Sequence, residues 1–212
     1  MRRRLTARFA GALALGAIVW SAGSTASDAA CARISPTKPG EVYLMRGLAN
    51  IFSLGLDIYG KHLSEIGVEN CVFNHSVWQS LVADIIERNY KGTLSPPIMI
   101  VGHSLGANIA PKMATEIAKH GIPVAYVAML DPVEPTVVGG NVGFIINYYL
   151  PHRKDNRLYP GSDFTGQLEN VNVAQFGGFD HFNIDEKSGL RSTILQRLVA
   201  ATQEALDEKE GE

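Results

Sequence analysis

The residues best suited to chemistry lie in the segment Gly102–Gly106, whose sequence is GHSLG. Ser104 stands between the two glycines, directly after the apolar run Ile98–Val101 and before a stretch that favours a helix. Small residues on both sides permit a turn so tight that the serine is held in a strained conformation with its hydroxyl above the sheet. A serine hydroxyl becomes a nucleophile when a neighbouring base takes its proton. The pattern therefore predicts Ser104 as the nucleophile of covalent catalysis.

A base and an acid that could activate this serine follow it along the chain. His181 stands in a turn-rich loop between the expected last strand and the terminal helix, and Asp131 directly follows the apolar run Val124–Leu130. That position places Asp131 at the carboxyl end of an expected strand, where functional side chains of parallel sheets gather. The histidine would take the serine proton, and the carboxylate would orient the imidazole and stabilise its charged form. We predict that Ser104, Asp131 and His181 act together as catalytic residues.

Other residues compete for two of these roles. Asp155 and Asp163 lie in the loop after the next expected strand and are alternatives for the acid. His152 is the main alternative to His181 as the base. The remaining histidines are expected in or beside helices, or next to the nucleophile: His62, His75, His103 and His120. The sequence leaves the choice of the acid open.

Negative charge that develops on a substrate oxygen needs hydrogen-bond donors beside the nucleophile, and losing one donor typically costs about 10²- to 10³-fold in rate. Leu105 begins the helix after Ser104, where unpaired N–H groups and the helix dipole favour negative charge. A second donor is expected from the loop after the first strand, where Gly47 permits a close approach and Leu48 offers its N–H. The preceding Arg46 would lock this loop through a carboxylate, which we favour, or face an anionic substrate.

The elements that must position these residues alternate along the chain. Amphipathic stretches predict four helices, at 51–66, 76–89, 107–120 and 188–208. Apolar and β-branched runs predict six strands, at 42–45, 68–73, 98–101, 124–130, 142–150 and 171–176. Residues 152–170 are polar and predicted to be irregular. Alternating strands and helices indicate an α/β fold, a three-layer α/β/α sandwich with a mostly parallel central sheet, compact and without a large lid.

The segment GHSLG resembles the nucleophile elbow of the α/β-hydrolase superfamily, as found in its lipases, esterases and thioesterases, and the resemblance covers about residues 41–208. The family implies the chain order nucleophile, acid, histidine, which Ser104, Asp131 and His181 follow. Most members resemble a pattern with the acid one strand later, and a minority, including lipases of the pancreatic type, place it where this chain has Asp131. Arg46 departs from the His-Gly start of this loop in many relatives.

The resemblance implies an esterase- or lipase-like serine hydrolase that cleaves carboxylic esters through an acyl-enzyme, without a cofactor. The expected partner is a small-molecule or lipid acyl ester. Two alternatives stay open: a thioesterase or acyltransferase with the same three residues, and a binding protein that keeps the fold without turnover. No metal is expected, because the sequence has no His-x-x-x-His or Cys-x-x-Cys spacing.

The N-terminal residues 1–30 have the order of a secretory signal peptide. Four arginines precede the uncharged stretch 9–20, and small residues fill 21–30. The uncharged stretch is shorter than the roughly 20 residues that a membrane-spanning helix needs. After removal of the signal peptide, we expect no integral membrane association. We predict cleavage between about residues 26 and 30, which leaves 31–212 as a single domain that is exported to a periplasm or outside the cell.

Composition and charge set further limits. The chain has 212 residues, of which 46% are hydrophobic and 19% charged, enough for one domain with a sizeable core. Cleavage after Ala26 would remove four arginines and no acid, so the net charge would change from −2 to −6. An acidic chain lacks the positive footprint that nucleic-acid binding needs. In an exported protein the two cysteines, Cys31 and Cys71, are predicted to form a disulfide.

Overall fold

The computed structural model describes residues 30–31, 36–48, 53–151 and 155–211. Its main sheet contains seven strands: β1 (Ala30–Cys31), β2 (Glu41–Arg46), β3 (Glu69–Asn74), β4 (Ile98–His103), β5 (Val124–Leu130), β7 (Asn141–Tyr149) and β9 (Thr165–Asn172). The spatial order is β1-β3-β2-β4-β5-β7-β9, and every pair is parallel except β1 with β3. The strand that precedes Ser104, β4, therefore lies in the middle of the sheet.

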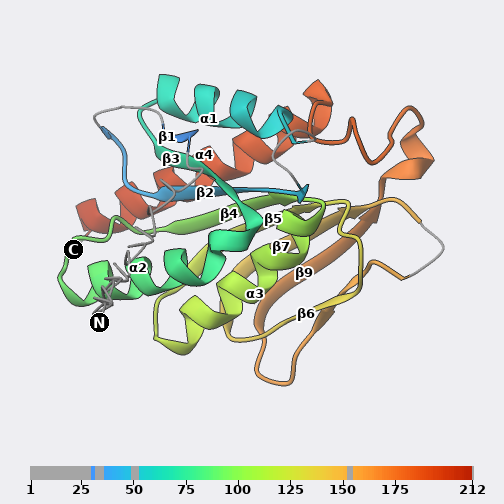
Figure 1. Cartoon of the computed structure of the whole chain (residues 1–212). Coiled ribbons are helices and arrows are strands. Elements are labelled where there is room, and N and C mark those ends of the chain that lie inside the picture. Colours follow the sequence, from blue (N-terminus) through green and yellow to red (C-terminus); the bar gives the residue numbers. More distant parts are fainter. Residues whose placement is uncertain (1–29, 32–35, 49–52, 152–154, 212) are drawn as a thin grey trace, which may run out of the picture.

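Helices cover both faces of this sheet (Figure 1). They are α1 (Gly55–Glu65), α2 (Trp78–Tyr90), α3 (Leu105–Lys119) and α4 (Ser188–Gly211), with short 3₁₀ helices η2 (His75–Val77) and η3 (Val173–Phe176). Buried side chains of α1 and α4 share one core with the sheet, and those of α2 and α3 share the other. The predicted three-layer α/β/α sandwich is confirmed, and most predicted elements are present with ends that differ by a few residues.

The central strand β4 shows why an unbroken apolar run forms a strand here. All six of its residues are buried. Met99 and Val101 point into the core beneath α1 and α4, whereas Ile98 and Ile100 point into the core beneath α2 and α3. A parallel strand covered on both faces needs apolar side chains at every position rather than at alternate ones. This burial fixes the strand that carries Ser104 at its carboxyl end.

The prediction of an irregular segment at 152–170 and a last strand at 171–176 is wrong. The last strand, β9, occupies 165–172 and is followed by η3. Within the same polar stretch, β8 (Leu158–Pro160) pairs with β6 (Thr136–Val138) in a separate two-stranded parallel sheet. The edge strand β9 exposes most of its side chains, so it lacks the apolar alternation by which strands are predicted from sequence.

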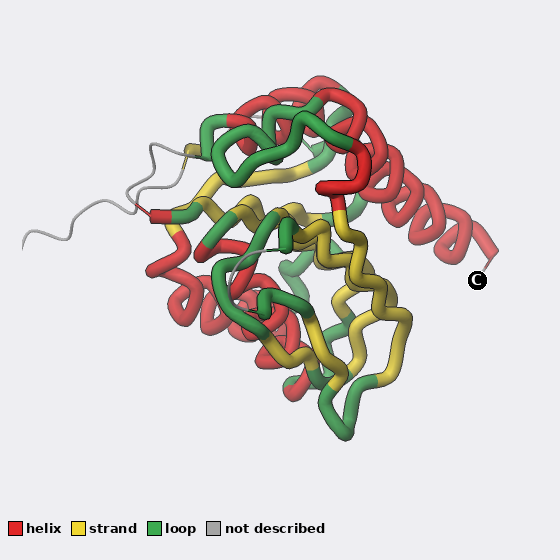
Figure 2. Tube along the Cα trace, turned by 90° about the vertical axis from the view of Figure 1, so that its right-hand side faces the viewer, coloured by secondary structure: helices red, strands yellow, loops and turns green. Residues whose placement is uncertain are grey.

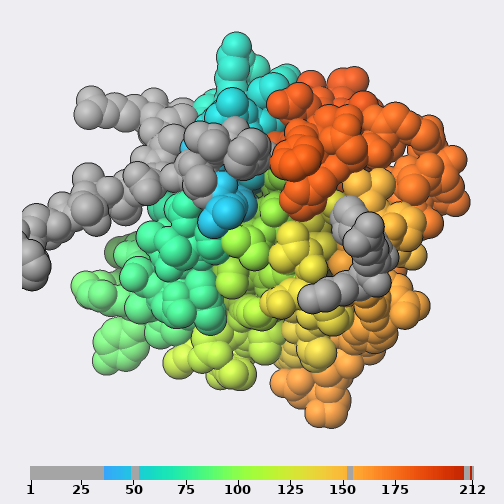
Figure 3. All heavy atoms as spheres, turned by 45° about the vertical axis from the view of Figure 1, so that its right-hand side comes forward, coloured from blue at the N-terminus to red at the C-terminus, as the bar shows by residue number. Residues whose placement is uncertain are grey.

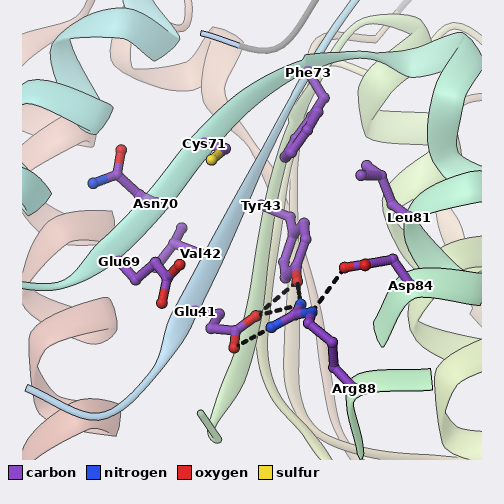
Figure 4. A pocket seen from close by; sticks show the side chains of 10 residues that line it. All are labelled: Glu41, Val42, Tyr43, Glu69, Asn70, Cys71, Phe73, Leu81, Asp84 and Arg88. Carbon is purple, nitrogen blue, oxygen red and sulfur yellow. Dashed lines mark hydrogen bonds and ion pairs between the residues drawn. The ribbon is translucent and has the colours of Figure 1, made fainter. Parts of the chain in front are cut away.

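A partly buried ion pair between Arg88 and Glu41 fastens α2 to the amino end of β2. Both carboxylate oxygens of Glu41 accept hydrogen bonds of 2.7 Å from the Arg88 guanidinium, and the Tyr43 hydroxyl donates to the same carboxylate at 2.7 Å. Hydrogen bonding to Glu41 raises the pKa of Arg88. These side chains border a hollow of about 250 Å³ beside Asp84 and Cys71 (Figure 4). Because Glu41 begins β2, the hollow lies at the opposite end of the sheet from Ser104.

Residues 1–29 of the predicted signal peptide lie outside the described residues. Among the helices of the described ranges, none has both the length and the apolar character needed to cross a membrane. The strand β1, which begins at Ala30, pairs with β3 so that Cys31 lies directly opposite Cys71. Directly opposed residues of an antiparallel pair have Cα atoms about 4.5–5.5 Å apart, which is within the range that a disulfide spans. The disulfide itself stays a prediction.

An intact-mass measurement tests this disulfide. We expect the chain produced without residues 1–26 in an oxidising compartment to gain about 2 Da on reduction, the mass of the two hydrogens that two thiols take up. A Cys71→Ser variant serves as the control and should show no intramolecular gain. Equal masses of the unaltered chain before and after reduction would contradict the prediction.

Candidate active site

The turn at Ser104 is held in a strained backbone conformation. Ser104 has φ 58° and ψ −123°, a combination that residues with a side chain rarely adopt. The glycines around it are required by close packing. A Cβ atom on Gly102 would lie 2.2 Å from the carbonyl oxygen of Gly106, and one on Gly106 would lie 1.9 Å from that of Met45. The sequence GHSLG thus brings α3 directly onto the end of β2 and projects the serine from between β4 and α3.

The structure brings Ser104, His181 and Asp131 together, although they are far apart in sequence. The Nε2 atom of His181 lies 3.0 Å from the Ser104 hydroxyl oxygen, and its Nδ1 atom lies 2.7 Å from Oδ2 of Asp131. Because the Asp131 carboxylate accepts a hydrogen bond from Nδ1–H, the Nε2 atom of the neutral ring is left to accept the serine proton. Asp131 is fully buried, whereas the side chains of Ser104 and His181 are partly exposed.

Hydrogen bonds to Oδ1 of Asp131 hold the carboxylate so that its other oxygen, Oδ2, faces His181. Asp131 follows β5 with a φ of 47°, and its Oδ1 atom accepts hydrogen bonds from the backbone N–H of Leu150 at 3.0 Å and from the Asn156 amide at 3.1 Å. Asn156 also donates to the carbonyl oxygens of Pro132 and Leu150. Sequence reasoning missed Asn156, because an asparagine in a polar loop gives no signal that it will be buried beside a carboxylate.

The alternatives to Asp131 and His181 lie elsewhere or outside the described residues. Asp155 is exposed and bonds to Arg157 and to the hydroxyl of Tyr159, and these hydrogen bonds lower its pKa to about 2. Asp163 lies beside Gly139, near the amino end of β7 and away from Ser104. His152 is outside the described residues. Of the described residues that competed for these roles, none is in contact with the Ser104 hydroxyl.

Gly47 lies directly against Ser104. A Cβ atom at this position would be 2.8 Å from Cβ of Ser104 and 3.2 Å from its hydroxyl oxygen. The N–H of Gly47 donates to the Ser53 hydroxyl at 3.0 Å, so Gly47 contributes shape rather than a hydrogen-bond donor to a substrate. Leu48 follows it, and Leu105 is the first residue of α3, where backbone N–H groups have no partner within the helix. The roles of Leu48 and Leu105 as donors stay predictions.

Arg46 makes the carboxylate contact that the sequence analysis favoured. Its guanidinium lies 2.6 Å from Oδ2 of Asp57 in α1 and its side chain is largely buried. This ion pair ties the end of β2 to the first turn of α1, on either side of the loop that follows β2. The carboxylate contact expected for Arg46 is confirmed, and its role as a lock for this loop stays a prediction.

The order of the elements and the site together identify the architecture. The serine lies in a strained turn between the central strand β4 and α3, the acid follows the next strand β5, and the histidine follows the last strand β9. The chain has the architecture of the α/β-hydrolase fold. Its catalytic candidates all lie at the carboxyl ends of parallel strands, the edge seen face-on from the direction of Figure 2.

No family model matches the chain, and no curated protein matches it in sequence. Among solved structures it is similar to Est1E from Butyrivibrio proteoclasticus, with 11% identity, 77% of this chain and 90% of the other covered, and a TM-score of 0.46. It is also similar to a protein of unknown function from Agrobacterium tumefaciens, with 14% identity, coverage of 79% and 94%, and a TM-score of 0.46. A thioesterase domain from the curacin biosynthetic pathway matches 47% of this chain and 38% of its own chain, with 18% identity and a TM-score of 0.32.

A second histidine, His103, is fully buried beside the candidate site. Its Nδ1 atom lies 2.8 Å from the Ser53 hydroxyl and its Nε2 atom lies 2.8 Å from the backbone carbonyl oxygen of His181. Burial lowers the pKa of His103 to about 4, so its ring is neutral near neutral pH. Sequence reasoning placed His103 in the elbow without these contacts, because Ser53 and His181 approach it only in the folded chain. Across the described residues, no cluster of His, Cys, Asp or Glu is arranged to hold a metal ion.

Asp185 joins the histidine loop to α1. Its Oδ2 atom accepts a hydrogen bond of 3.0 Å from the backbone N–H of Gly55, the first residue of α1, and it is almost fully buried. The other oxygen, Oδ1, is buried without a hydrogen-bond partner among the described residues. Burial raises the pKa of Asp185 to about 6. A buried carboxylate with a raised pKa stabilises the fold only while it is protonated.

We expect Asp185→Asn to change how stability depends on pH. In the unaltered protein the contribution of Asp185 is fully present below its unfolded pKa of 3.8 and is lost as the pH rises through about 6. The variant keeps the acceptor for Gly55 and has no charge to bury, so it should be more stable by on the order of 1–3 kcal/mol at pH 8 and similar at pH 4. Urea unfolding at both values measures this, and Asp207→Asn on exposed α4 is the control. An equal difference at both pH values would contradict the assignment.

Proposed function

We propose that this chain is an exported serine hydrolase that cleaves carboxylic esters through an acyl-enzyme. The observation that carries the proposal is the continuous set of contacts from the Ser104 hydroxyl through His181 to buried Asp131. The arrangement needs no cofactor, since nucleophile, base and acid are all side chains. Export is supported by the arginine-led N-terminal segment, and the N-terminus of the recovered protein, read from its intact mass, tests it.

The first half of the proposed reaction forms the acyl-enzyme. His181 Nε2 takes the proton of the Ser104 hydroxyl as its oxygen attacks the ester carbonyl carbon. The carbonyl oxygen becomes an oxyanion, which accepts hydrogen bonds from the backbone N–H groups of Leu105 and Leu48. Asp131 stabilises the imidazolium. The C–O bond to the alcohol then breaks, and the leaving oxygen takes the proton from His181.

The second half of the proposed reaction uses water. His181, neutral again, removes a proton from a water molecule whose oxygen attacks the carbonyl carbon of the acyl-enzyme. The same two N–H groups stabilise the second oxyanion. When the bond to Ser104 breaks, the serine oxygen takes back the proton from His181 and the carboxylic acid leaves. The enzyme returns to its starting protonation, with one ester and one water converted into an acid and an alcohol.

Hydrolysis of p-nitrophenyl esters from acetate to palmitate tests the nucleophile. We expect Ser104→Ala to lower turnover by about 10⁴-fold or more, because the variant lacks the hydroxyl on which the proposed acyl-enzyme forms. The control Ser192→Ala alters an exposed serine of α4 and should keep full activity. A fluorophosphonate should label the unaltered protein at Ser104 alone. The preferred chain length separates an esterase from a lipase, and parallel assays with thioesters identify the thioesterase alternative. Absence of both turnover and labelling would contradict the proposal in favour of a binding protein.

Replacement of the acid tests the role of Asp131. Asp131→Asn should lower kcat on the order of 10³- to 10⁴-fold, because the amide no longer holds His181 in the required tautomer. Asp155→Asn and Asp163→Asn are matched controls, and each should stay within about twofold of the unaltered enzyme. Steady-state kinetics on the preferred ester measure the three variants. A loss in Asp155→Asn as large as that in Asp131→Asn would assign the acid differently.

A further inference from the structure

Three separate segments must meet at the nucleophile for the proposed chemistry. The loop after β2 carries Gly47 and Leu48, the elbow carries Ser104, and the loop before α4 carries His181. Figure 3 shows the blue stretch of the first loop and the orange stretch of the last loop on the same face of the molecule. The loop of Gly47 and the loop of His181 are far apart in the sequence, so covalent connectivity alone does not set the distance between them.

A chain of hydrogen bonds crosses from one loop to the other through a single imidazole. The N–H of Gly47 donates to the Ser53 oxygen at 3.0 Å, so the Ser53 hydroxyl hydrogen is free to point at Nδ1 of His103, 2.8 Å away. Nε2 of His103 lies 2.8 Å from the carbonyl oxygen of His181, which can only accept. Nδ1 of His103 therefore accepts a hydrogen bond from Ser53, and Nε2 donates one to the His181 carbonyl. This pattern requires a neutral ring with its proton on Nε2.

We propose that His103 is a positioning residue, which holds the loop of Gly47 and Leu48 and the loop of His181 in register with Ser104 by way of the Ser53 hydroxyl. The inference rests on the proposed function, since register matters only if Leu48 donates to an oxyanion and His181 accepts the serine proton. His103 touches neither substrate nor the reacting atoms. It acts through the backbone on both sides of the nucleophile.

The surroundings of His103 favour this role. The ring is fully buried, and so is the Ser53 side chain, with only 1% of its surface exposed. In such an environment hydrogen bonds are strong, and leaving one partner unsatisfied is costly. A pKa lowered by burial keeps the ring neutral, so the direction of each hydrogen bond is the same throughout the range in which a serine hydrolase works. His103 and His181 also lie with ring centroids 5.2 Å apart.

A positioning role predicts a particular kinetic signature. Displacement of the Leu48 N–H weakens its hydrogen bond to the oxyanion but leaves the binding of the ester unchanged. We therefore expect kcat to fall while KM stays nearly unchanged. A residue that only stabilises the fold would lower the melting temperature and the number of active molecules, but not the turnover of each active molecule. Titration of active sites with a fluorophosphonate separates the two, because it counts the competent molecules in each preparation.

We expect Ser53→Ala and His103→Leu each to lower kcat per titrated site by about 10- to 10³-fold, with KM within about twofold. His103→Gln should recover to within about fivefold of the unaltered enzyme, because its amide offers one acceptor to Ser53 and one donor to His181. The double variant Ser53→Ala/His103→Leu should be no slower than the slower single variant, since both changes break the same path. Thr202→Val, which removes a buried hydroxyl bonded to Val199 in α4, is the matched control and should keep kcat.

Hydrogen exchange of the Gly47 amide gives a second readout that needs no turnover. We expect exchange to accelerate about tenfold or more in Ser53→Ala and in His103→Leu, but not in Thr202→Val. Acceleration in Ser53→Ala alone would overturn the path through His103. An unchanged kcat per titrated site in both variants would overturn the positioning role. Loss of ester hydrolysis and of labelling in the unaltered protein would instead overturn the proposed function, and the exchange result would still decide whether His103 orders the loop.

Discussion

The close contact between α3 and the end of β2 is the constraint on which the site depends. Gly106 lies so near the carbonyl oxygens of Met45 and Arg46 that no side chain fits between them. This contact sets the depth at which α3 begins, and hence the height at which Ser104 leaves β4. It also brings Gly47 against Ser104, so one packing contact places both the Ser104 hydroxyl and the loop that faces it.

The remaining parts of the site are fixed relative to this contact by polar groups in the protein interior. Asn156 and the N–H of Leu150 orient Asp131, and Asp131 in turn orients His181. Ion pairing between Arg46 and Asp57 and the hydrogen bond from Gly55 to Asp185 link α1 to the loops on either side of it. Each loop is therefore held at more than one point, as a preorganised set of donors and acceptors requires.

Sequence reasoning could find the residues whose position follows from chain order and strand ends. Ser104 has a motif, and Asp131 and His181 follow strands whose parallel direction brings them to one edge. It could not find Ser53, Asn156 or the contacts of His103, because these depend on which side chains meet after folding and leave no local pattern. Choosing between Asp131 and Asp163 required knowing that Asp163 lies at the opposite end of the sheet from Ser104. The periodicity of the sequence does not reveal this position.

The polar side chains of the edge strand β9 both hid it from prediction and affect how its edge behaves. Periodicity could not predict β9 because its exposed residues are polar, among them Gln167 and Glu169. The unpaired backbone of an edge strand can template the addition of a strand from another molecule, and charged or polar side chains on that edge oppose such growth. The polarity that hides β9 from pattern analysis is thus a safeguard against aggregation between sheets.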